Sequence, residues 1–414
     1  MLDDDLKLVK KAQKKLALLD EEKRNECLEK ISVALLKNKD VILAANQTDV
    51  LNAKQNGMMA SFIDRLTLTE KRIDDLASSI LELIKLDGVV GNLIEKIERP
   101  NGLCIEKVYV PFGVIAVIFE ARPNVCVDIA TLCLKTANAC VLKGGKESIN
   151  TNKVLVHIMK DAIKDIIDPA VLYLVEQTDR AITDELITKR QYVDLLIPRG
   201  SARLINHIVS NAKIPYIETG AGVCNLYVHE QADIDMAINI AINAKYQRPS
   251  VCNAIENLIV DEKIAKAFLP KLYEEFNKLN IKMLGDEKTL EIINVGVATE
   301  EDFYTEYNDY SISIKIVKNL DEAIDFINEH STKHSETIVT NNKKVAERFL
   351  NEIESACVYH NASTRFSDGG CFGFGAEVGI STQKLHARGP MGLKEICSYK
   401  YIIKGDGQVR WAIS

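Results

Sequence analysis

The chain has 414 residues, of which 47% are hydrophobic and 27% charged, and its formal net charge of -7 gives a pI near 5.7. This length predicts two or three domains. The acidic balance argues against a nucleic-acid or anionic-membrane partner, because either would require a basic surface. Composition and charge therefore fit an enzyme that acts on a small-molecule substrate, with no nucleic acid and no membrane among its partners.

Compartment and redox state can also be predicted from simple features. The longest strongly apolar stretch, 108–119, is too short to span a bilayer and is interrupted by Pro111 and Gly113. The acidic N-terminus lacks the basic start and apolar centre of a secretory signal. The ten cysteines include no CxxC pair and are too sparse for a disulfide scaffold, so reduced thiols are expected. These features predict a cytoplasmic protein.

Apolar residues recur at helical spacing through the first hundred residues, as at Leu6, Val9 and Leu16, and predict amphipathic helices. The pattern changes at Leu103, because residues 103–110 alternate in polarity like a half-exposed strand. The N-terminal helices are therefore expected to lie on a larger α/β structure.

The run GVIAVIF at 113–119 predicts a central strand that is buried on both faces. A helix over 125–138 and a second strand over 139–142 would complete a βαβ unit. Further strands are predicted at 172–175, 193–197 and 226–228. The alternation implies a parallel sheet with helices on both faces, and ligands of such sheets collect at the strand ends.

A second alternation of strands and helices follows residue 252 and predicts a second α/β domain. Its strands are expected at 255–260, 311–317, 337–340 and 356–359. The segment 361–392 is rich in glycine and predicts an irregular loop around a site. Residues 396–404 predict a last strand.

Cys252, in RPSVCNAIE at 248–256, is the leading candidate for a catalytic residue. It follows a proline-containing loop and precedes a predicted strand, a position where loops often carry chemistry. A thiolate is the nucleophile that forms thioesters. Burial as a packing residue is the alternative, and it is the expected role of most other cysteines. Cys126, Cys224 and Cys371 lie nearer to the predicted site loops and stay open as lining residues.

Two short motifs fit a nucleotide phosphate. Lys143-Gly144-Gly145-Lys146-Glu147-Ser148 follows a strand and opens a helix, so its glycines and positive charge suit a phosphate group. Gly200-Ser201 also begins a helix after a strand. A tight turn with solvated lysines and a simple helix cap are the respective alternatives. Neither motif is a P-loop or a GxGxxG fingerprint.

The histidines predict no metal site. His330 and His334 are four residues apart, but no third ligand has a suitable spacing. No Cys-His pair can be named from the sequence either, so the thiol of Cys252 must be activated in another way.

Four blocks of the sequence resemble the aldehyde dehydrogenase superfamily, and the last of them is the most specific. They are 110–125, with VPFGV and FEARPNV; LKGGKES at 142–148; PSVCNAIE at 249–256; and NASTRF at 361–366 with GAEVGISTQKLHARGPMG at 375–392. The resemblance extends over essentially the whole chain.

The resemblance implies an α/β fold of aldehyde dehydrogenase type, with two doubly wound α/β domains plus a small oligomerisation sheet. The expected boundaries place an NADP-binding domain at 1–102 and 111–228 and a catalytic domain with the nucleophilic cysteine at 229–385. The oligomerisation sheet and C-terminal tail would occupy 103–110 and 386–414. A homo-oligomer is expected, because bare sheet edges are unfavourable.

The activity that the resemblance implies is the NADPH-dependent reduction of L-glutamyl 5-phosphate to L-glutamate 5-semialdehyde, with release of phosphate, in proline biosynthesis. Cys252 would form a thioester that a nicotinamide then discharges. The alternatives are a non-phosphorylating NAD(P)-dependent aldehyde dehydrogenase and a catalytically silent nucleotide-binding protein. Contact with glutamate 5-kinase is a further possibility that the sequence leaves open.

The superfamily also implies roles for individual residues, with Cys252 as the catalytic one. The residues expected to bind substrate are Glu120, Arg122, Asn124, Asn361, Ser363, Thr364 and Arg365. Those expected to bind the NADP(H) cofactor are Lys143, Gly144, Lys146, Ser148, Gly200, Ser201, Gly220 and Glu306.

The sequence departs from the superfamily pattern in two places, and the role of one matching residue is open. The asparagine that oxidising relatives use as an oxyanion donor has no certain counterpart near 120–124. Around Cys224, Val223 and Asn225 stand where an asparagine and a histidine are expected. Glu218 falls where oxidising relatives carry the base that activates water, and its role here is open.

Overall fold

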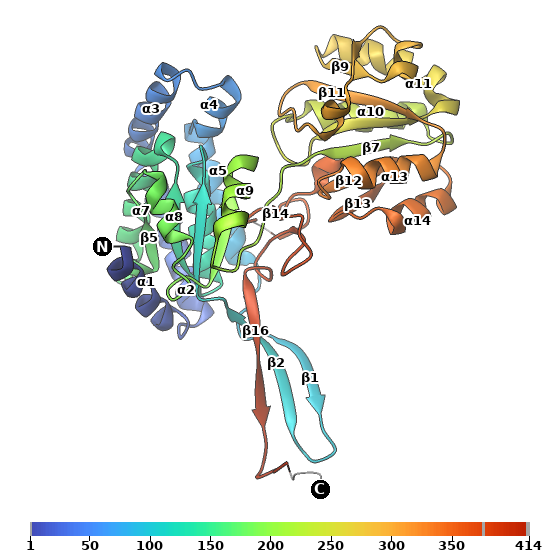
Figure 1. Ribbon diagram of the computed structural model, residues 1–414. Helices are drawn as coiled ribbons and strands as arrows, with labels where there is room; N and C mark the ends of the chain where they lie inside the picture. The colour runs from blue at the N-terminus through green and yellow to red at the C-terminus, as the bar shows by residue number, and fades with distance from the viewer. Residues whose placement is uncertain (1, 375–376, 411–414) are drawn as a thin grey trace. The chain divides into compact units, whose positions relative to one another are not determined.

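A computed structural model describes residues 2–374 and 377–410 (Figure 1). The chain divides into two compact units: 1–217 with 373–379 and 391–414, and 218–372 with 380–390. Gly375 and Ala376, which begin the last resemblance block, lie outside the described residues. Within those residues no helix is long and apolar enough to cross a membrane.

The first unit begins with amphipathic helices, as the apolar spacing predicts. Leu28, Ile31 and Leu35 form a buried stripe of this kind on the second helix. Asp20 and Thr69 begin two of the helices by accepting backbone N–H groups, which is the usual N-cap interaction. The helices are α1 (Leu2–Leu16), α2 (Glu21–Lys37), α3 (Lys39–Gln55), α4 (Ala60–Leu66) and α5 (Glu70–Lys85).

A four-stranded parallel sheet follows in the order β5-β4-β3-β6. All residues of its central strand β3 are buried, so the prediction from the apolar run at 113–119 is confirmed. Its strands are β3 (Val114–Phe119), β4 (Ala139–Gly144), β5 (Leu172–Leu174) and β6 (Leu195–Arg199). The helical segments between and after them are α6 (Asn124–Lys135), η1 (Lys146–Ser148), α7 (Ile149–Ile163), η2 (Pro169–Val171), α8 (Arg180–Leu186) and α9 (Ala202–Asn211).

The second unit contains a seven-stranded parallel sheet in the order β10-β9-β11-β8-β7-β12-β13. One hydrophobic core lies between the sheet and helices α10 and α11, and another lies against α13 and α14, so helices cover both faces (Figure 1). The strands are β7 (Cys224–Val228), β8 (Ile255–Asp261), β9 (Lys282–Gly285), β10 (Gly296–Val297), β11 (Ser311–Val317), β12 (Ser335–Val339) and β13 (Cys357–His360).

The helical segments of this second unit are α10 (Ile234–Tyr246), α11 (Glu262–Lys278), α12 (Glu287–Leu290), η3 (Glu300–Tyr304), α13 (Leu320–His330), α14 (Lys343–Glu352) and η4 (Thr364–Phe366). A two-stranded sheet of β14 (Ile380–Ser381) and β15 (Gly389–Pro390) lies in the same unit. The strand predicted at 226–228 was expected in the first alternation, but as β7 it belongs to this second sheet. A strand's own residues do not reveal which of two parallel sheets it joins.

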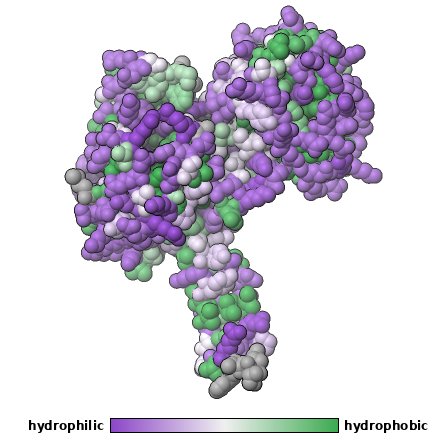
Figure 2. Space-filling view, viewed as in Figure 1, coloured by the Kyte–Doolittle hydropathy of each residue, from purple (hydrophilic) through white to green (hydrophobic). Residues whose placement is uncertain are grey.

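A three-stranded antiparallel ribbon completes the first unit, in the order β1-β2-β16. It consists of β1 (Leu93–Glu98), β2 (Cys104–Pro111) and β16 (Cys397–Lys404), so the strands predicted at 103–110 and 396–404 are confirmed. The expectation of helix throughout the first hundred residues is wrong for β1, because its conformation depends on pairing with β2. Apolar side chains gather on this ribbon, at the bottom of Figure 2.

Candidate active site

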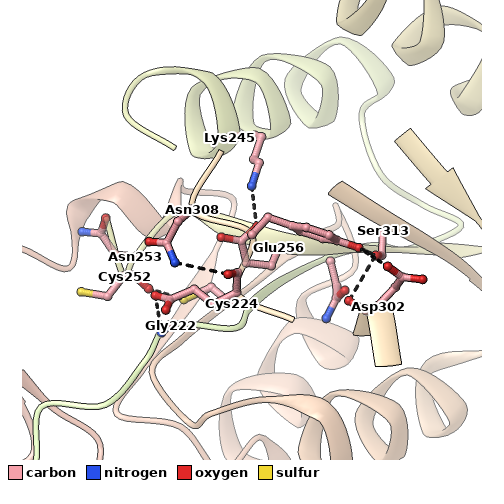
Figure 3. Close-up of polar contacts among 12 residues, drawn as sticks. Gly222, Cys224, Lys245, Cys252, Asn253, Glu256, Asp302, Asn308 and Ser313 are labelled. Atoms are coloured by element: carbon pink, nitrogen blue, oxygen red, sulfur yellow. Dashed lines mark hydrogen bonds and ion pairs between the residues drawn. The ribbon is translucent and has the colours of Figure 1, made fainter. Parts of the chain in front are cut away.

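Cys252 lies in the turn over 247–254, between α10 and β8, and is partly exposed. Its carbonyl oxygen is so close to Gly222 that a Cβ at position 222 would lie only 1.6 Å from it. The Cys224 thiol donates to the same carbonyl at 3.2 Å. The segment that leads into β7 therefore holds the backbone of the cysteine, and only glycine fits at position 222. Figure 3 shows this arrangement.

Glu306, predicted to meet the cofactor, also contacts the backbone of this segment. Its carboxylate accepts the Gly222 N–H at 2.9 Å. Asn308 donates through its side chain to the Glu306 carbonyl at 3.2 Å. Glu306 thus fixes the backbone that contacts Cys252, whatever else it binds.

The turn at 363–367 forms hydrogen bonds with Asn253, the residue that follows Cys252. The Asn253 amide donates to the Ser367 carbonyl at 2.8 Å, and the Thr364 hydroxyl donates to the Asn253 carbonyl at 2.7 Å. Ser363 caps this turn by accepting the Arg365 N–H at 3.3 Å. Ser363 and Thr364 are buried, and these contacts use their hydroxyls to hold the turn that carries Cys252.

Two other residues predicted for the substrate make contacts of a different kind. The Asn361 amide accepts the Thr340 N–H at 2.9 Å and donates to the Thr340 carbonyl at 3.1 Å, which ties the end of β13 to the end of β12. Arg365 donates through Nε to the Gln247 side chain at 3.1 Å, at the start of the turn that carries Cys252. Of the residues predicted at 361–365, Arg365 is therefore the one that reaches this turn with a charged group.

A buried ion pair lies beneath the turn. Lys245, near the end of α10, and Glu256, near the start of β8, are 2.5 Å apart, and their side chains are 0% and 1% exposed (Figure 3). Burial raises the pKa of Glu256, and the Lys245 ammonium opposes that rise. The pair joins the two ends of the segment that carries Cys252. This ion pair was not predicted from the sequence, although Lys245 and Glu256 flank the PSVC motif.

Asn225, one of the departures from the superfamily pattern, belongs to a buried polar chain across three strands. Its backbone N–H and side-chain amide donate to Glu336 on β12 at 2.7 and 2.8 Å, and its side-chain oxygen Oδ1 accepts from Asn257 on β8 at 3.0 Å. Asn257 also donates to the Phe303 carbonyl at 2.9 Å, shortly before Glu306. Burial raises the pKa of Glu336 to about 7.

The first unit contains a cavity of about 570 Å³ at the ends of its parallel strands. The register aligns Phe119 with Gly144 and with Arg199, so the strand ends meet at one edge of the sheet. The residues that line the cavity include Gly144 and the basic residues Lys143, Lys146, Arg180, Arg203 and His207. Burial lowers the pKa of Lys143, whose ammonium donates to the Gly144 carbonyl at 3.0 Å.

Two residues that were predicted for different ligands contact each other here. The Glu120 carboxylate, predicted for substrate, accepts the Ser201 N–H at 2.7 Å. Gly200 makes room for this contact, because a Cβ at position 200 would lie 2.6 Å from the Glu120 carboxylate. The Ser201 hydroxyl caps α9 by accepting the Leu204 N–H at 3.4 Å. Ser201 therefore caps the helix, which was the alternative to phosphate binding for this motif.

The remaining predicted residues are spread over both units. In the first unit, Ser148 is buried and accepts from Asn152 at 3.0 Å, so its hydroxyl does not line the cavity. Arg122 lies before α6, and Asn124 begins that helix and donates to Asp128 at 3.0 Å. In the second unit, Gly220 lies against Thr382, whose hydroxyl would be 2.8 Å from a Cβ at position 220.

The structure also describes the region near 120–124, where the oxyanion asparagine has no certain counterpart, and Glu218. Ala121, in the turn before α6, has a positive φ of 43°, and its N–H donates to the Glu147 carboxylate at 2.7 Å. The Glu218 N–H donates to the Gln383 side chain. Over 2–374 and 377–410, no three histidine, cysteine or carboxylate side chains form a group that could hold a metal ion.

Comparisons with known proteins agree with one another. A model of the aldehyde dehydrogenase family matches residues 2–302 and 312–402. A gamma-glutamyl phosphate reductase from Ligilactobacillus salivarius is 50% identical over 97% of this chain and 97% of its own length, and one from Dictyoglomus thermophilum is 48% identical over 99% of each. The crystal structure of gamma-glutamyl phosphate reductase from Thermotoga maritima is 45% identical, with a TM-score of 0.96, and the match covers 99% of this chain and 100% of that one.

Proposed function

Because the chain belongs to the aldehyde dehydrogenase family, we propose that it reduces L-glutamyl 5-phosphate to L-glutamate 5-semialdehyde, with NADPH as the reductant. The relatives named gamma-glutamyl phosphate reductase support this substrate, since they match nearly the full length at 48–50% identity. The observation on which the proposal depends is the partly exposed Cys252 thiol on a backbone that its neighbours hold rigidly.

Cys252 acts as the nucleophile. Its thiolate attacks the acyl carbon of the substrate, the bond from that carbon to the phosphate oxygen breaks, and a thioester forms. Gly222 and Cys224 contact the Cys252 carbonyl and so restrain the backbone of the turn that carries the thiol. The N–H is then ready to stabilise the negative charge that develops on the attacked carbonyl oxygen. A reduced nicotinamide, when bound, supplies the hydride that brings the thioester to the aldehyde.

The cavity of the first unit fits a phosphorylated nucleotide. Lys143, Lys146 and Arg203 supply positive charge at strand ends and helix starts, where phosphates bind well. Lys146 and Arg203 are the candidates for a ribose 2′-phosphate, which distinguishes NADP from NAD. Three carboxylates line the cavity. Glu120 accepts a hydrogen bond from Ser201, Asp184 lies 2.6 Å from His207, and the charge of Asp179 opposes the lowering of the Lys143 pKa by burial. Glu147 bonds Ala121 and does not line the cavity.

Six of the seven predicted substrate residues divide into two groups under this proposal, and Glu120, which accepts the Ser201 N–H, belongs to neither. Arg122, Asn124 and Arg365 are proposed to contact the substrate. Asn361, Ser363 and Thr364 are proposed to act by shaping the turn on which Cys252 depends. The first unit would then hold the cofactor, and the second would carry the nucleophile.

The antiparallel ribbon is proposed to pair with a second copy of this chain. Within the described residues, each outer strand of the ribbon pairs on one side only, and Leu93, Tyr401 and Ile403 are 54%, 52% and 61% exposed on it. Exposed edges that carry apolar side chains favour pairing with another strand. Light scattering of the wild type and of the double variant Tyr401→Lys/Ile403→Lys tests whether the ribbon pairs. A dimer or larger assembly is expected for the wild type and a monomer for the variant.

The activity is tested in the reverse direction, by following NADP⁺ reduction with glutamate semialdehyde. The proposal expects turnover that requires phosphate or arsenate in the wild type and none in Cys252→Ala. Cys104→Ser, which changes a cysteine of the ribbon, should behave as the wild type. Equal turnover without phosphate or arsenate would instead favour the non-phosphorylating alternative, in which water discharges the thioester.

A further inference from the structure

Two arginines flank the nucleophile within the second unit. Arg248 lies four residues before Cys252 in the same turn, is exposed, and makes no hydrogen bond or ion pair with any residue of 2–374 or 377–410. Arg365 comes from the turn at 363–367 and is partly buried. The contacts among the described residues therefore give the Arg248 guanidinium no structural role.

The position of Arg365 is fixed at both ends of the turn that carries Cys252. Its Nε donates to Gln247, the neighbour of Arg248, at 3.1 Å. Its carbonyl accepts from Asn253, the neighbour of Cys252, at 3.4 Å. Thr364, the residue before it, donates to the Asn253 carbonyl at 2.7 Å. The Arg365 side chain therefore lies along the turn, from the cysteine towards Arg248.

The electrostatics of this place favour an anion. Burial lowers the pKa of Arg365. The Cys252 thiol, the Asp368 carboxylate and the Cys371 thiol each raise this pKa, whereas repulsion from Arg248 lowers it further. Asp368 is also engaged in its own loop, where it accepts the Gly370 N–H at 2.9 Å. Two guanidiniums that repel each other beside a nucleophile are an arrangement that an oxyanion would stabilise.

We propose that Arg248 and Arg365 form the subsite for the phosphoryl group that leaves when Cys252 is acylated. This inference rests on the proposed function and assigns the arginines within it. As the bond from sulfur to the acyl carbon forms, the bond from that carbon to the phosphate oxygen breaks. Its electron pair stays on the phosphate, which takes up a proton from water. The two guanidiniums offset the negative charge that grows on the leaving oxygen.

The connectivity of the substrate favours the phosphoryl group over the glutamyl α-carboxylate as the occupant. A single oxygen joins the phosphorus to the carbon that Cys252 attacks, whereas three further carbons separate that carbon from the α-carboxylate. The Arg365 side chain, which lies along the turn that carries Cys252, is therefore placed for the nearer of the two anions.

The first test measures alkylation of Cys252 and needs no turnover. Iodoacetate carries a negative charge and iodoacetamide does not, so the ratio of their rates reports the field at the thiol. Arg248→Gln and Arg365→Gln should each lower this ratio several-fold and weaken the protection of Cys252 by inorganic phosphate. Lys266→Gln, an exposed position on α11, controls for net charge and should match the wild type. An unchanged ratio and unchanged protection in both arginine variants would overturn the subsite.

The second test measures turnover in the reverse direction. Arg248→Gln and Arg365→Gln should raise the KM for phosphate roughly tenfold or more, because hydrogen bonds to charged groups are the strong ones. The KM for glutamate semialdehyde should stay near that of the wild type, and Arg365→Lys should recover part of the phosphate affinity. A rise confined to the semialdehyde KM would assign the arginines to the α-carboxylate and overturn the proposal.

The two tests separate failure of this inference from failure of the proposed function. A wild-type protein with no phosphate-dependent turnover would contradict the function. If phosphate still protected its Cys252 from alkylation, and protection weakened in the arginine variants, an anion site at Arg248 and Arg365 would nevertheless be supported.

Discussion

The cavity of the first unit and the turn that carries Cys252 in the second are built in different ways. The cavity lies where β3, β4 and β6 end, so the register of one parallel sheet brings its residues together. The turn is held by segments that are far apart in the chain, at 222–224 and 364–367. A change in the cavity should therefore alter binding locally, whereas a change around the turn should alter stability and chemistry together.

The largest effect is expected from the buried pair beneath the turn. Lys245→Met leaves Glu256 buried without its cation and should lower the free energy of unfolding by about 3–5 kcal/mol. Lys245→Met/Glu256→Leu should recover most of that loss, because apolar residues often replace a buried pair well. Lys278→Met, which breaks an exposed pair with Glu275, should cost about 1 kcal/mol or less. Urea unfolding measures the free energy of unfolding of all three variants.

Activity of the double variant adds a second criterion to that experiment. If the pair also positions the ends of the turn, the double variant should be stable but slow, with a changed rate of Cys252 alkylation. A double variant with wild-type kcat would show that the pair only stabilises the fold. Stability and chemistry would then not be coupled at this turn.

Gly222→Ala tests the close approach to the Cys252 carbonyl. A Cβ there would lie 1.6 Å from the carbonyl oxygen, so the backbone of the turn must move. We expect kcat to fall roughly a hundredfold, since small displacements of a reacting group have effects of this size. Single-turnover kinetics should assign the loss to acylation. Unchanged acylation would mean that the turn tolerates displacement.

The Glu336 carboxyl gives the second unit a pH dependence that can be measured. Burial raises its pKa from 4.5 to about 7 in the folded protein. Between these values the folded protein binds more protons than the unfolded chain, so this group's contribution to stability falls as pH rises through that range. Relative to Glu336→Gln, the wild type should therefore lose on the order of 1 kcal/mol or more between about pH 4.5 and 7. Parallel stability curves for the two proteins would contradict the raised pKa.

Lys146→Glu should have the smallest and most local effect. A carboxylate repels a 2′-phosphate and can hydrogen-bond ribose hydroxyls, so the KM for NADPH should rise roughly tenfold while that for NADH falls or stays constant. The melting temperature and the rate of Cys252 alkylation should not change. Lys11→Glu, an exposed position on α1, controls for net charge. An equal rise for both coenzymes would argue against Lys146 as the residue that selects NADP.

The same difference between the regions explains how much could be predicted from the sequence. The strand at 113–119 and the LKGGKES motif depend on local apolar runs and on residues that are adjacent in the chain, so they were predictable. Cys252 was identified as a candidate because its neighbours form a recognisable motif. The strand β1 was missed, because its conformation depends on its partner.

The partners of the predicted residues could not be read from the sequence. Glu120 contacts Ser201, and Thr364 contacts Asn253, across 81 and 111 positions of the chain. Such contacts depend on how the strands are ordered in each sheet, which residue types at single positions do not reveal. Asn225 is similar, since its link to Glu336 exists only because β7 and β12 are neighbours.

Trapping the acylated enzyme tests the central claim most directly. The protein is mixed with glutamate semialdehyde and NADP⁺ without phosphate, so that the thioester has no phosphate to discharge it, and is then quenched and digested. We predict one equivalent of NADPH and a glutamyl adduct on the peptide that contains Cys252, which disappears when phosphate is added. An adduct on another peptide, or an equal burst of NADPH from Cys252→Ala, would contradict the account.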